Sequence, residues 1–162
     1  MTTSRPDASF LFAHPAHLVA FGFGSGLAPR APGTVGTLLG WPLYWLIVAV
    51  ASSTGAQCAL IAAAFVVGIW ACARTGRALG VADHGGIVWD EIVAFALVLL
   101  FTPAGWLWAG LAFALFRLFD ILKPWPIRYF DARLKSGFGV MFDDLLAAGF
   151  SIAVMKGVAW LV

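Results

Sequence analysis

The sequence of 162 residues contains very few charged side chains. They make up 11% of the chain, whereas apolar residues make up 62%. A soluble domain has about a quarter charged residues and about half apolar ones, so this chain lacks the charge needed to cover a water-soluble surface. We therefore expect lipid to contact much of it. The formal net charge is only +2 and the ten Lys and Arg residues form no run, which argues against a nucleic-acid partner.

Cysteine and the common catalytic motifs are also scarce. The two cysteines, Cys58 and Cys72, lie in one apolar stretch, about 21 Å apart if that stretch is helical, so they cannot pair with each other there. No Gly-x-Ser-x-Gly elbow, P-loop or Cys-x-x-Cys occurs. These absences argue against a serine hydrolase, a P-loop ATPase and a thiol redox enzyme.

Long apolar stretches dominate what is present. Residues 38–54 and 56–73 predict two membrane helices joined by a tight polar link, each near the short limit for crossing a bilayer. The uncharged stretch 92–116 is interrupted by a Pro-Gly turn signal and predicts two shorter helices, at about 88–101 and 105–120. A last helix is expected from Asp143 to about Leu161. The chain is thus predicted to be all-α, a compact membrane-embedded bundle of about four to five helices, some of them short.

The charges predict which side of the membrane each link faces. Apart from Lys156, they fall in residues 5–30, 74–91, 117–135 and 143–144, whereas the links near Ser53 and Pro103 carry none. Because basic loops remain in the cytoplasm, all four charged segments should lie on that side. No second-domain linker is visible, so we expect one membrane domain over residues 18–162 after a loosely ordered segment, 1–17.

Acidic residues gather at the ends of the predicted helices. In the proposed topology five carboxylates meet at one depth, where an apolar environment makes them costly unless they are paired or coordinated. Such oxygen ligands suit magnesium or manganese, and metal-assisted phosphoryl hydrolysis is the reaction class that uses them. The alternative is that the acids at helix starts are ordinary helix caps. The five are Asp90, Glu91, Asp120, Asp143 and Asp144, and Asp83 precedes the first pair in the sequence.

Two further segments carry candidates for substrate binding. Arg117 and Lys123 each lie three residues from Asp120, so one helix face would present two cations to a phosphate; a structural ion pair of Arg117 with Asp120 is an equally good interpretation. The Gly- and Pro-rich segment 23–37 leads into the first apolar stretch and contains the hydroxyls of Thr34 and Thr37. Gly lets a backbone approach an anion closely, although a plain turn is the simpler explanation.

Four segments together resemble a known family. They are Pro32-Gly33-Thr34-Val35-Gly36-Thr37, Ile87-Val88-Trp89-Asp90-Glu91, the segment 116–127 (FRLFDILKPWPI), and Gly139-Val140-Met141-Phe142-Asp143-Asp144. In this order they resemble phosphatidylglycerophosphatase A, and the match extends from about Leu18 onward. The resemblance implies a helical enzyme of the bacterial inner membrane that hydrolyses phosphatidylglycerophosphate to phosphatidylglycerol with the help of Mg²⁺.

The resemblance also implies roles for the residues. Asp90, Asp120, Asp143 and Asp144 would be catalytic, and Asp90, Glu91, Asp143 and Asp144 would bind the metal. Thr34, Thr37, Arg117 and Lys123 would bind the phospholipid substrate at the cytoplasmic face. A small ion or metal transporter is the rival interpretation, although a permeation path would place acids near mid-span rather than at helix ends. The oligomeric state is left open.

Overall fold

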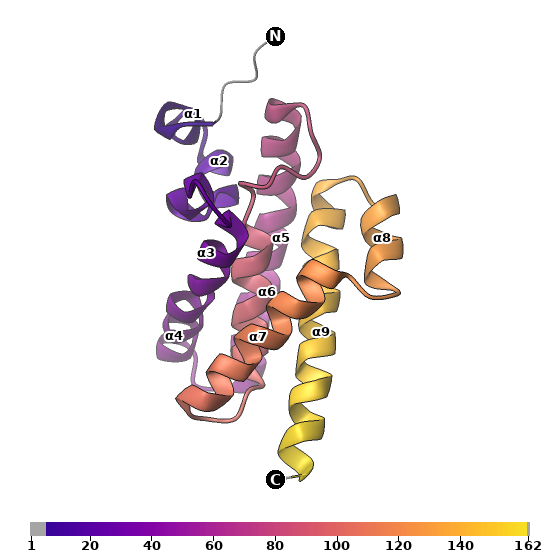
Figure 1. Ribbon diagram of the computed structural model, residues 1–162. Coiled ribbons are helices and arrows are strands. Elements are labelled where there is room, and N and C mark those ends of the chain that lie inside the picture. Colours follow the sequence, from indigo (N-terminus) through magenta and orange to yellow (C-terminus); the bar gives the residue numbers. More distant parts are fainter. Residues whose placement is uncertain (1–5, 162) are drawn as a thin grey trace.

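The computed structural model describes residues 6–161, and all regular secondary structure in that range is helical, as predicted (Figure 1). The elements are α1 (Ala8–Phe12), α2 (Pro15–Ala20), a 3-10 turn η1 (Gly22–Leu27), α3 (Pro32–Leu38), α4 (Gly40–Val50), α5 (Thr54–Leu79), α6 (Trp89–Leu100), α7 (Trp106–Leu122), α8 (Ile127–Arg133) and α9 (Gly137–Leu161).

Three segments are long and apolar enough to cross a membrane: residues 32–50, which combine α3 and α4, together with α5 and α9. In α5 only 22% of the apolar window is buried inside the protein, so most of this helix faces lipid. Helices α6 and α7 have 12 and 17 residues, about 18 and 26 Å, and are shorter than the bilayer core of about 30 Å. The mixture of long and short membrane helices agrees with the prediction.

Helix α6 is the centre of the bundle. It packs against α3, α4, α5, α7 and α9, and ten of its twelve residues are buried. The ring of Phe95 contacts the rings of Trp41, Phe113 and Phe116, which fixes α6 against α4 and α7. Because α6 is surrounded on so many sides, the polar residues of its first turn are placed in the protein interior.

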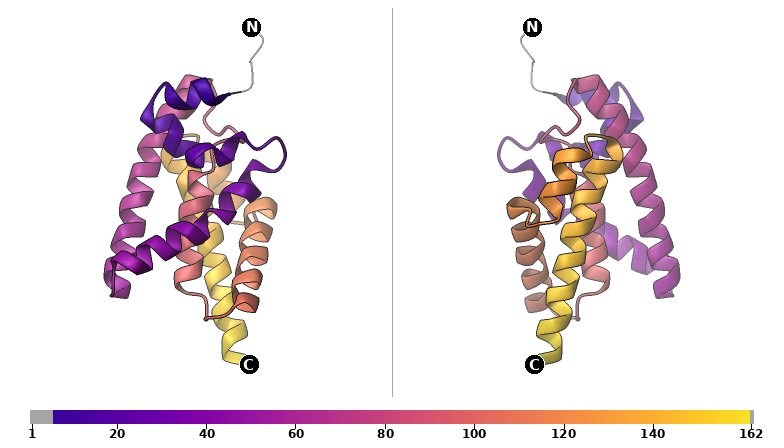
Figure 2. Two further views of the ribbon diagram at one scale, coloured as in Figure 1. Left: turned by 90° about the vertical axis from the view of Figure 1, so that its left-hand side faces the viewer. Right: turned by 90° about the vertical axis from the view of Figure 1, so that its right-hand side faces the viewer.

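The two ends of the bundle differ in composition. The uncharged links between α4 and α5 and between α6 and α7 lie at the same end as the C-terminus (Figure 1). The opposite end contains α1, α2, α8, the end of α5 and the start of α9, and Figure 2 shows the same separation from both sides. The described parts of all four charged segments therefore belong to one half of the molecule. Lys156, which is exposed near the end of α9, is the exception.

The last helix begins earlier than predicted, at Gly137 rather than at Asp143. A side chain on Gly137 would come 2.3 Å from the carbonyl oxygen of Ile69, and one on Gly139 would meet the Leu134 carbonyl. The two glycines let α9 start in close contact with its neighbours. Asp143 and Asp144 consequently lie inside the helix, not at its first residue.

The boundaries of the first long helices also differ from the predicted ones. Helix α5 continues to Leu79 and ends at Gly80, whose φ of 72° is the left-handed conformation typical of a C-cap. The sequence predicts an end at residue 73, because Arg74 and Arg77 are the first charges after the apolar stretch. Both arginines are exposed on the last turns of the helix, where they extend beyond the apolar region.

The N-terminal segment contains two short helices. Residues 1–17 are predicted to be loosely ordered, and residues 1–5 of that segment lie outside the described range. Within residues 8–20, α1 and α2 pack on each other and α2 packs on α5. His17 is buried there, its Nδ1 3.0 Å from the hydroxyl of Thr75, and its ring stacks on Phe10. These contacts attach the segment to the bundle.

Candidate active site

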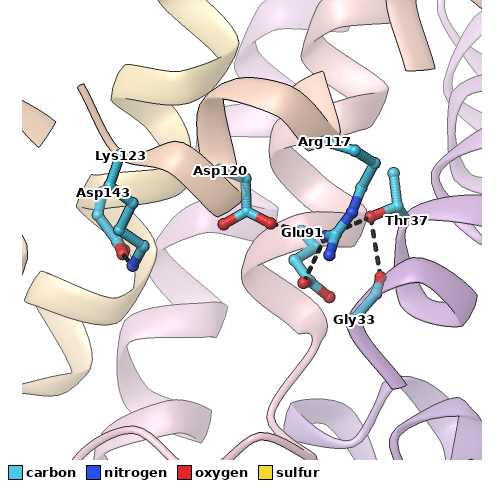
Figure 3. Close-up of polar contacts among 7 residues, drawn as sticks. All are labelled: Gly33, Thr37, Glu91, Arg117, Asp120, Lys123 and Asp143. Atoms are coloured by element: carbon cyan, nitrogen blue, oxygen red, sulfur yellow. Dashed lines mark hydrogen bonds and ion pairs between the residues drawn. The ribbon is translucent and has the colours of Figure 1, made fainter. Parts of the chain in front are cut away.

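The acids predicted from the sequence come together at the charged end of the bundle. Asp90 and Glu91 lie in the first turn of α6, and Asp143 and Asp144 lie on the neighbouring helix α9. All four are buried, with exposed fractions of 3–9%. Asp120, near the end of α7, shares the guanidinium of Arg117 with Glu91, and in the view of Figure 3 it lies between Glu91 and Asp143. Three helices therefore contribute to one cluster of five carboxylates, which we call the acidic pocket.

Arg117 of α7 connects this pocket to α3. Its Nη1 lies 2.7 Å from Glu91 Oε1, 2.7 Å from Asp120 Oδ2 and 3.2 Å from the hydroxyl of Thr37 (Figure 3). Thr37 in turn donates to the carbonyl oxygen of Gly33 at 2.9 Å. The expected ion pair of Arg117 with Asp120 is present, but the same guanidinium also neutralises Glu91 from another helix.

The Gly-rich segment makes this arrangement possible. A side chain on Gly33 would come 2.1 Å from Glu91 Oε1, and one on Gly36 would meet Val88 at 2.6 Å and Glu91 Oε2 at 3.0 Å. Because neither residue has a side chain, α3 can lie directly against the first turn of α6. The motif Pro32–Thr37 thus brings a hydroxyl and a backbone carbonyl to the acidic pocket. Thr34 lies on the same short helix and is half-buried.

Lys123 lies at the other end of the pocket. It is the C-cap of α7, with a left-handed backbone (φ 42°, ψ 62°), and its ammonium pairs with Asp143 (Figure 3). The same ammonium lies 3.2 Å from Asp131 Oδ1. The left-handed turn directs the side chain to α8 and α9 instead of to Asp120. The prediction of a shared helix face is therefore wrong for Lys123, although this cation does lie at the pocket.

Several buried polar atoms of the pocket have no hydrogen-bond partner among the described residues. A buried charged atom without a partner is costly, so these atoms indicate that a charged group belongs between them. They are Asp90 Oδ1, Glu91 Oε2, Asp143 Oδ1, Asp144 Oδ2 and Arg117 Nε. The four carboxylate oxygens suit a hard divalent cation, and the arginine nitrogen suits an anion.

The chemistry of the acids therefore fits Mg²⁺, whereas their spacing does not form a closed shell. Within residues 6–161, no three acidic, histidine or cysteine side chains are grouped as a ready metal site. Among these residues, the five carboxylates of the pocket nevertheless face only two cations, Arg117 and Lys123. If all five are ionised, three negative charges are uncompensated, and a phosphate would be repelled unless a cation were bound as well.

The helix-cap alternative does not account for these acids. In the described part of the chain, the N-cap of α6 is Val88 and has no side-chain capping bond, so neither Asp90 nor Glu91 caps the helix through one. Asp143 and Asp144 lie within α9 and cannot cap its start. Their position in the interior needs another explanation.

Some polar residues near the site differ from expectation. Asp83 is exposed on the loop before α6 and is not buried with Asp90. Asp131 of α8, which we do not select from the sequence, pairs with both Lys123 and Lys135, the latter at 3.5 Å. Its spacing of four residues from Lys135 is the only available signal, and that spacing is common on exposed helices.

Comparison with known sequences gives a consistent result. Residues 18–159 match the family described as Phosphatidylglycerophosphatase A. The chain is 47% identical over 163 residues to a protein named phosphatidylglycerophosphatase A of Haemophilus influenzae, covering 99% of this chain and 98% of that one. It is 38% identical over 144 residues to the protein of the same name from Escherichia coli K12, covering 88% and 83% of the two chains. No solved structure matches the chain.

Proposed function

The chain belongs to the phosphatidylglycerophosphatase A family, and on this basis we propose that it hydrolyses phosphatidylglycerophosphate to phosphatidylglycerol and inorganic phosphate. The observation that carries the proposal is the acidic pocket at one end of a membrane bundle. Four of its carboxylate oxygens and one arginine nitrogen are buried and have no hydrogen-bond partner among the described residues. We place the protein in the bacterial inner membrane with the pocket on the cytoplasmic side. The charged segments lie in the same half of the molecule as the pocket, and basic segments remain in the cytoplasm.

Magnesium is part of the proposal. Asp90, Glu91, Asp143 and Asp144 would hold one or two Mg²⁺ ions, which when bound supply positive charge to the phosphate oxygens and favour attack by water. The support is the excess of buried carboxylates over cations, and the oxygen on each of these four side chains that has no partner within residues 6–161. Without added positive charge, the pocket would repel a phosphate monoester.

The chain's own residues supply binding and orientation. Arg117 Nε, unpartnered in the described range, is a donor for a phosphate oxygen, while its Nη1 is fixed by Glu91, Asp120 and Thr37. Thr37 accepts from Arg117 and donates to Gly33, so it fixes the guanidinium plane. Thr34 and Lys123 are the remaining candidates for contacting the head group. A positioned donor acts strongly here because the site is shielded from water.

In the proposed reaction, the oxygen of water forms a bond to phosphorus, and the bond from phosphorus to the terminal glycerol oxygen breaks. That glycerol oxygen leaves with a proton as the hydroxyl of phosphatidylglycerol. Asp120 contacts Arg117 through Oδ2, and its position at the pocket suits a role in orienting the water.

The test is phosphate release by purified protein from phosphatidylglycerophosphate and from phosphatidic acid, with Mg²⁺ and with EDTA. We expect release from phosphatidylglycerophosphate that EDTA abolishes and Mg²⁺ restores. Asp143→Asn and Asp144→Asn should lower turnover by about 10² or more, because an amide keeps the shape and loses the charge. Asp7→Asn, at an exposed position on the N-terminal segment, is the matched control and should retain activity.

Two results would contradict the proposal. Full activity in EDTA, with little effect of either pocket substitution, would remove the metal and leave the carboxylates as structural groups. Absence of phosphate release under every condition, from protein that is folded by its circular dichroism and thermal unfolding, would reject the activity itself.

A further inference from the structure

An apolar groove between α5, α6 and α9 begins at Asp90 of the acidic pocket. The groove has a volume of about 300 Å³. Asp90 lies at its polar end, with an Oδ1 that no described residue contacts by a hydrogen bond, and most of the remaining lining is apolar. Residues that line it include Ala62 and Phe65 of α5, Val93 and Leu97 of α6, and Met141 and Leu145 of α9.

Close contacts hold α5 to α6 and α9 beside the groove. The indole of Trp89 donates to the carbonyl oxygen of Ala64 at 3.0 Å, and Gly68 lets Met141 and Trp89 approach α5 closely. Toward the start of α5, the lining includes small side chains, Ala62 of α5 and Ala94 of α6. These residues do not fill the space between the helices.

The groove runs from Asp90 along α6, in the direction of the uncharged end of the bundle. From Asp90 to Leu97 it follows about 10 Å of helix α6. Its α5 side opens to the surface, since Val66, which also lines it, is 63% exposed. An exposed apolar face on a membrane helix contacts lipid chains. We therefore expect the groove to open sideways into the bilayer.

We propose that this groove binds one acyl chain of the phospholipid substrate while the terminal phosphate lies in the acidic pocket. The inference rests on the proposed function and adds a subsite to it. Asp90 belongs to both the pocket and the groove, so one lipid can occupy the two together. The head group separates the terminal phosphate from the chains, and the open α5 side lets a chain bend into the groove from the bilayer.

Variants that fill the groove test the subsite. Ala62→Trp and Leu97→Trp place an indole in it, whereas Ala63→Trp makes the same exchange on an exposed neighbouring position of α5 outside the lining. Each is assayed on diacyl phosphatidylglycerophosphate and on its deacylated, water-soluble head group. We expect the groove variants to raise KM for the diacyl lipid by about fivefold or more and to leave KM and kcat for the soluble substrate unchanged. The acyl chain binds equally in the ground state and the transition state, so its loss affects KM and not kcat.

The control Ala63→Trp should behave as the unmodified protein on both substrates. Equal loss on the diacyl and the soluble substrate would mean that the groove variants disturb the pocket, and unchanged kinetics would mean that the groove is not used. Either outcome overturns the subsite.

A binding measurement separates this inference from the proposed activity. A phosphonate analogue of phosphatidylglycerophosphate, which cannot be hydrolysed at the terminal phosphorus and carries a diazirine on one acyl chain, is photolysed with the full-length protein in Mg²⁺, and adducts are located by mass spectrometry. We expect adducts on the groove residues of α5 and α6, suppressed by the same analogue without the diazirine but not by phosphatidylcholine with the same chains.

Adducts elsewhere, or adducts that phosphatidylcholine suppresses equally well, would show ordinary surrounding lipid and overturn the subsite even if the enzyme is active. Adducts in the groove from protein that releases no phosphate would retain the subsite and reject the proposed hydrolysis.

Discussion

Arg117 joins three helices of the acidic pocket. Its side chain connects α3, α6 and α7 through Thr37, Glu91 and Asp120. The sequence could place only Asp120 near it, because that residue is three positions away on the same helix. Its contact with Glu91 depends on how two helices pack, and it means that Arg117 has a structural role besides the substrate-binding role we propose.

Exchanging the charges of Arg117 and Asp120 separates the local pair from the wider network. In the double variant Arg117→Asp and Asp120→Arg the local pair remains, but the new arginine leaves the position that contacts Glu91 and Thr37. We expect Arg117→Asp alone to destabilise the protein by about 3–5 kcal/mol, as for a broken buried pair, and the exchange not to restore phosphate release. Thermal unfolding in detergent and the phosphatase assay measure the two effects.

Arg128→Gln, at an exposed position on α8, is the control for loss of an arginine. It should change neither the thermal unfolding of the protein nor its phosphate release. Recovery of most of the activity in the charge-exchanged variant would mean that Arg117 serves only as the partner of Asp120.

His17 links the N-terminal helices to α5 and makes stability depend on pH. Burial lowers the pKa of His17, and the nearby charges of His14 and Arg74 lower it further. The unfolded chain binds a proton near pH 6.5, whereas the folded chain binds it only at lower pH. The unfolded state therefore holds more protons below pH 6.5, and stability falls as the pH drops through that value.

We expect the midpoint of thermal unfolding to decrease between pH 7.5 and pH 5.5, and to decrease less in His17→Asn. Asn keeps a polar group beside Thr75 but does not titrate. A parallel decrease in both proteins would show that other groups, and not His17, cause the pH dependence.

At the level of the helices, small residues decide how closely the elements approach. Gly137 lets α9 begin against α5, and Gly33 lets α3 lie on Glu91. In the sequence, Gly33 indicates a turn or a segment that leads into the first apolar stretch. No sequence pattern predicts a role for Gly137. Both are points of contact between helices, and Gly137 sets the position of Asp143 and Asp144 relative to α6.

Two glycines of α9 give a matched test of this role. Gly137→Ala would place Cβ 2.3 Å from the Ile69 carbonyl oxygen, whereas a Cβ on Gly149 meets nothing within 4 Å among the described residues. We expect Gly137→Ala to cost about 1–3 kcal/mol and to lower phosphate release, because α9 must move away from α5. Gly149→Ala should leave both nearly unchanged, and equal effects at the two positions would contradict the packing role of Gly137.

At the level of the whole molecule, charges and exposed tryptophans are distributed unevenly between the two ends of the bundle. Trp106 at the start of α7 and Trp160 at the end of α9 are exposed at the uncharged end, and Trp125 is exposed beyond α7 on the charged side. Tryptophan side chains favour the two membrane interfaces. Their positions agree with a bundle whose uncharged links face one side of the membrane and whose acidic pocket faces the other.

Cysteine labelling in intact bacterial cells tests this orientation. In a protein with Cys58→Ala and Cys72→Ala, single cysteines are introduced as Ala104→Cys in the α6–α7 link and Arg128→Cys on α8, both exposed. We expect an impermeant maleimide to label position 104 in intact cells and position 128 only after the membrane is opened, because basic segments stay in the cytoplasm. The reverse pattern would invert the topology and place the acidic pocket outside the cytoplasm.

The sequence by itself determined the class of the protein and the candidate residues of the site. Low charge and long apolar stretches dictate a helical membrane bundle, because these properties depend only on composition and local spacing. The acids were identifiable for the same reason, since carboxylates beside apolar segments are rare and costly. Local spacing also offered the pairing of Arg117 with Asp120 as one of two interpretations, and the structure contains this pair.

Only the tertiary structure decided which charges neutralise one another and where the helices begin. The pairs of Arg117 with Glu91 and of Lys123 with Asp143 join different helices, and the early start of α9 depends on the fit of Gly137 to α5. The apolar groove likewise needs three helices to form its walls. Contacts of this kind depend on the distance between side chains that are far apart along the chain, and neither composition nor periodicity contains that distance.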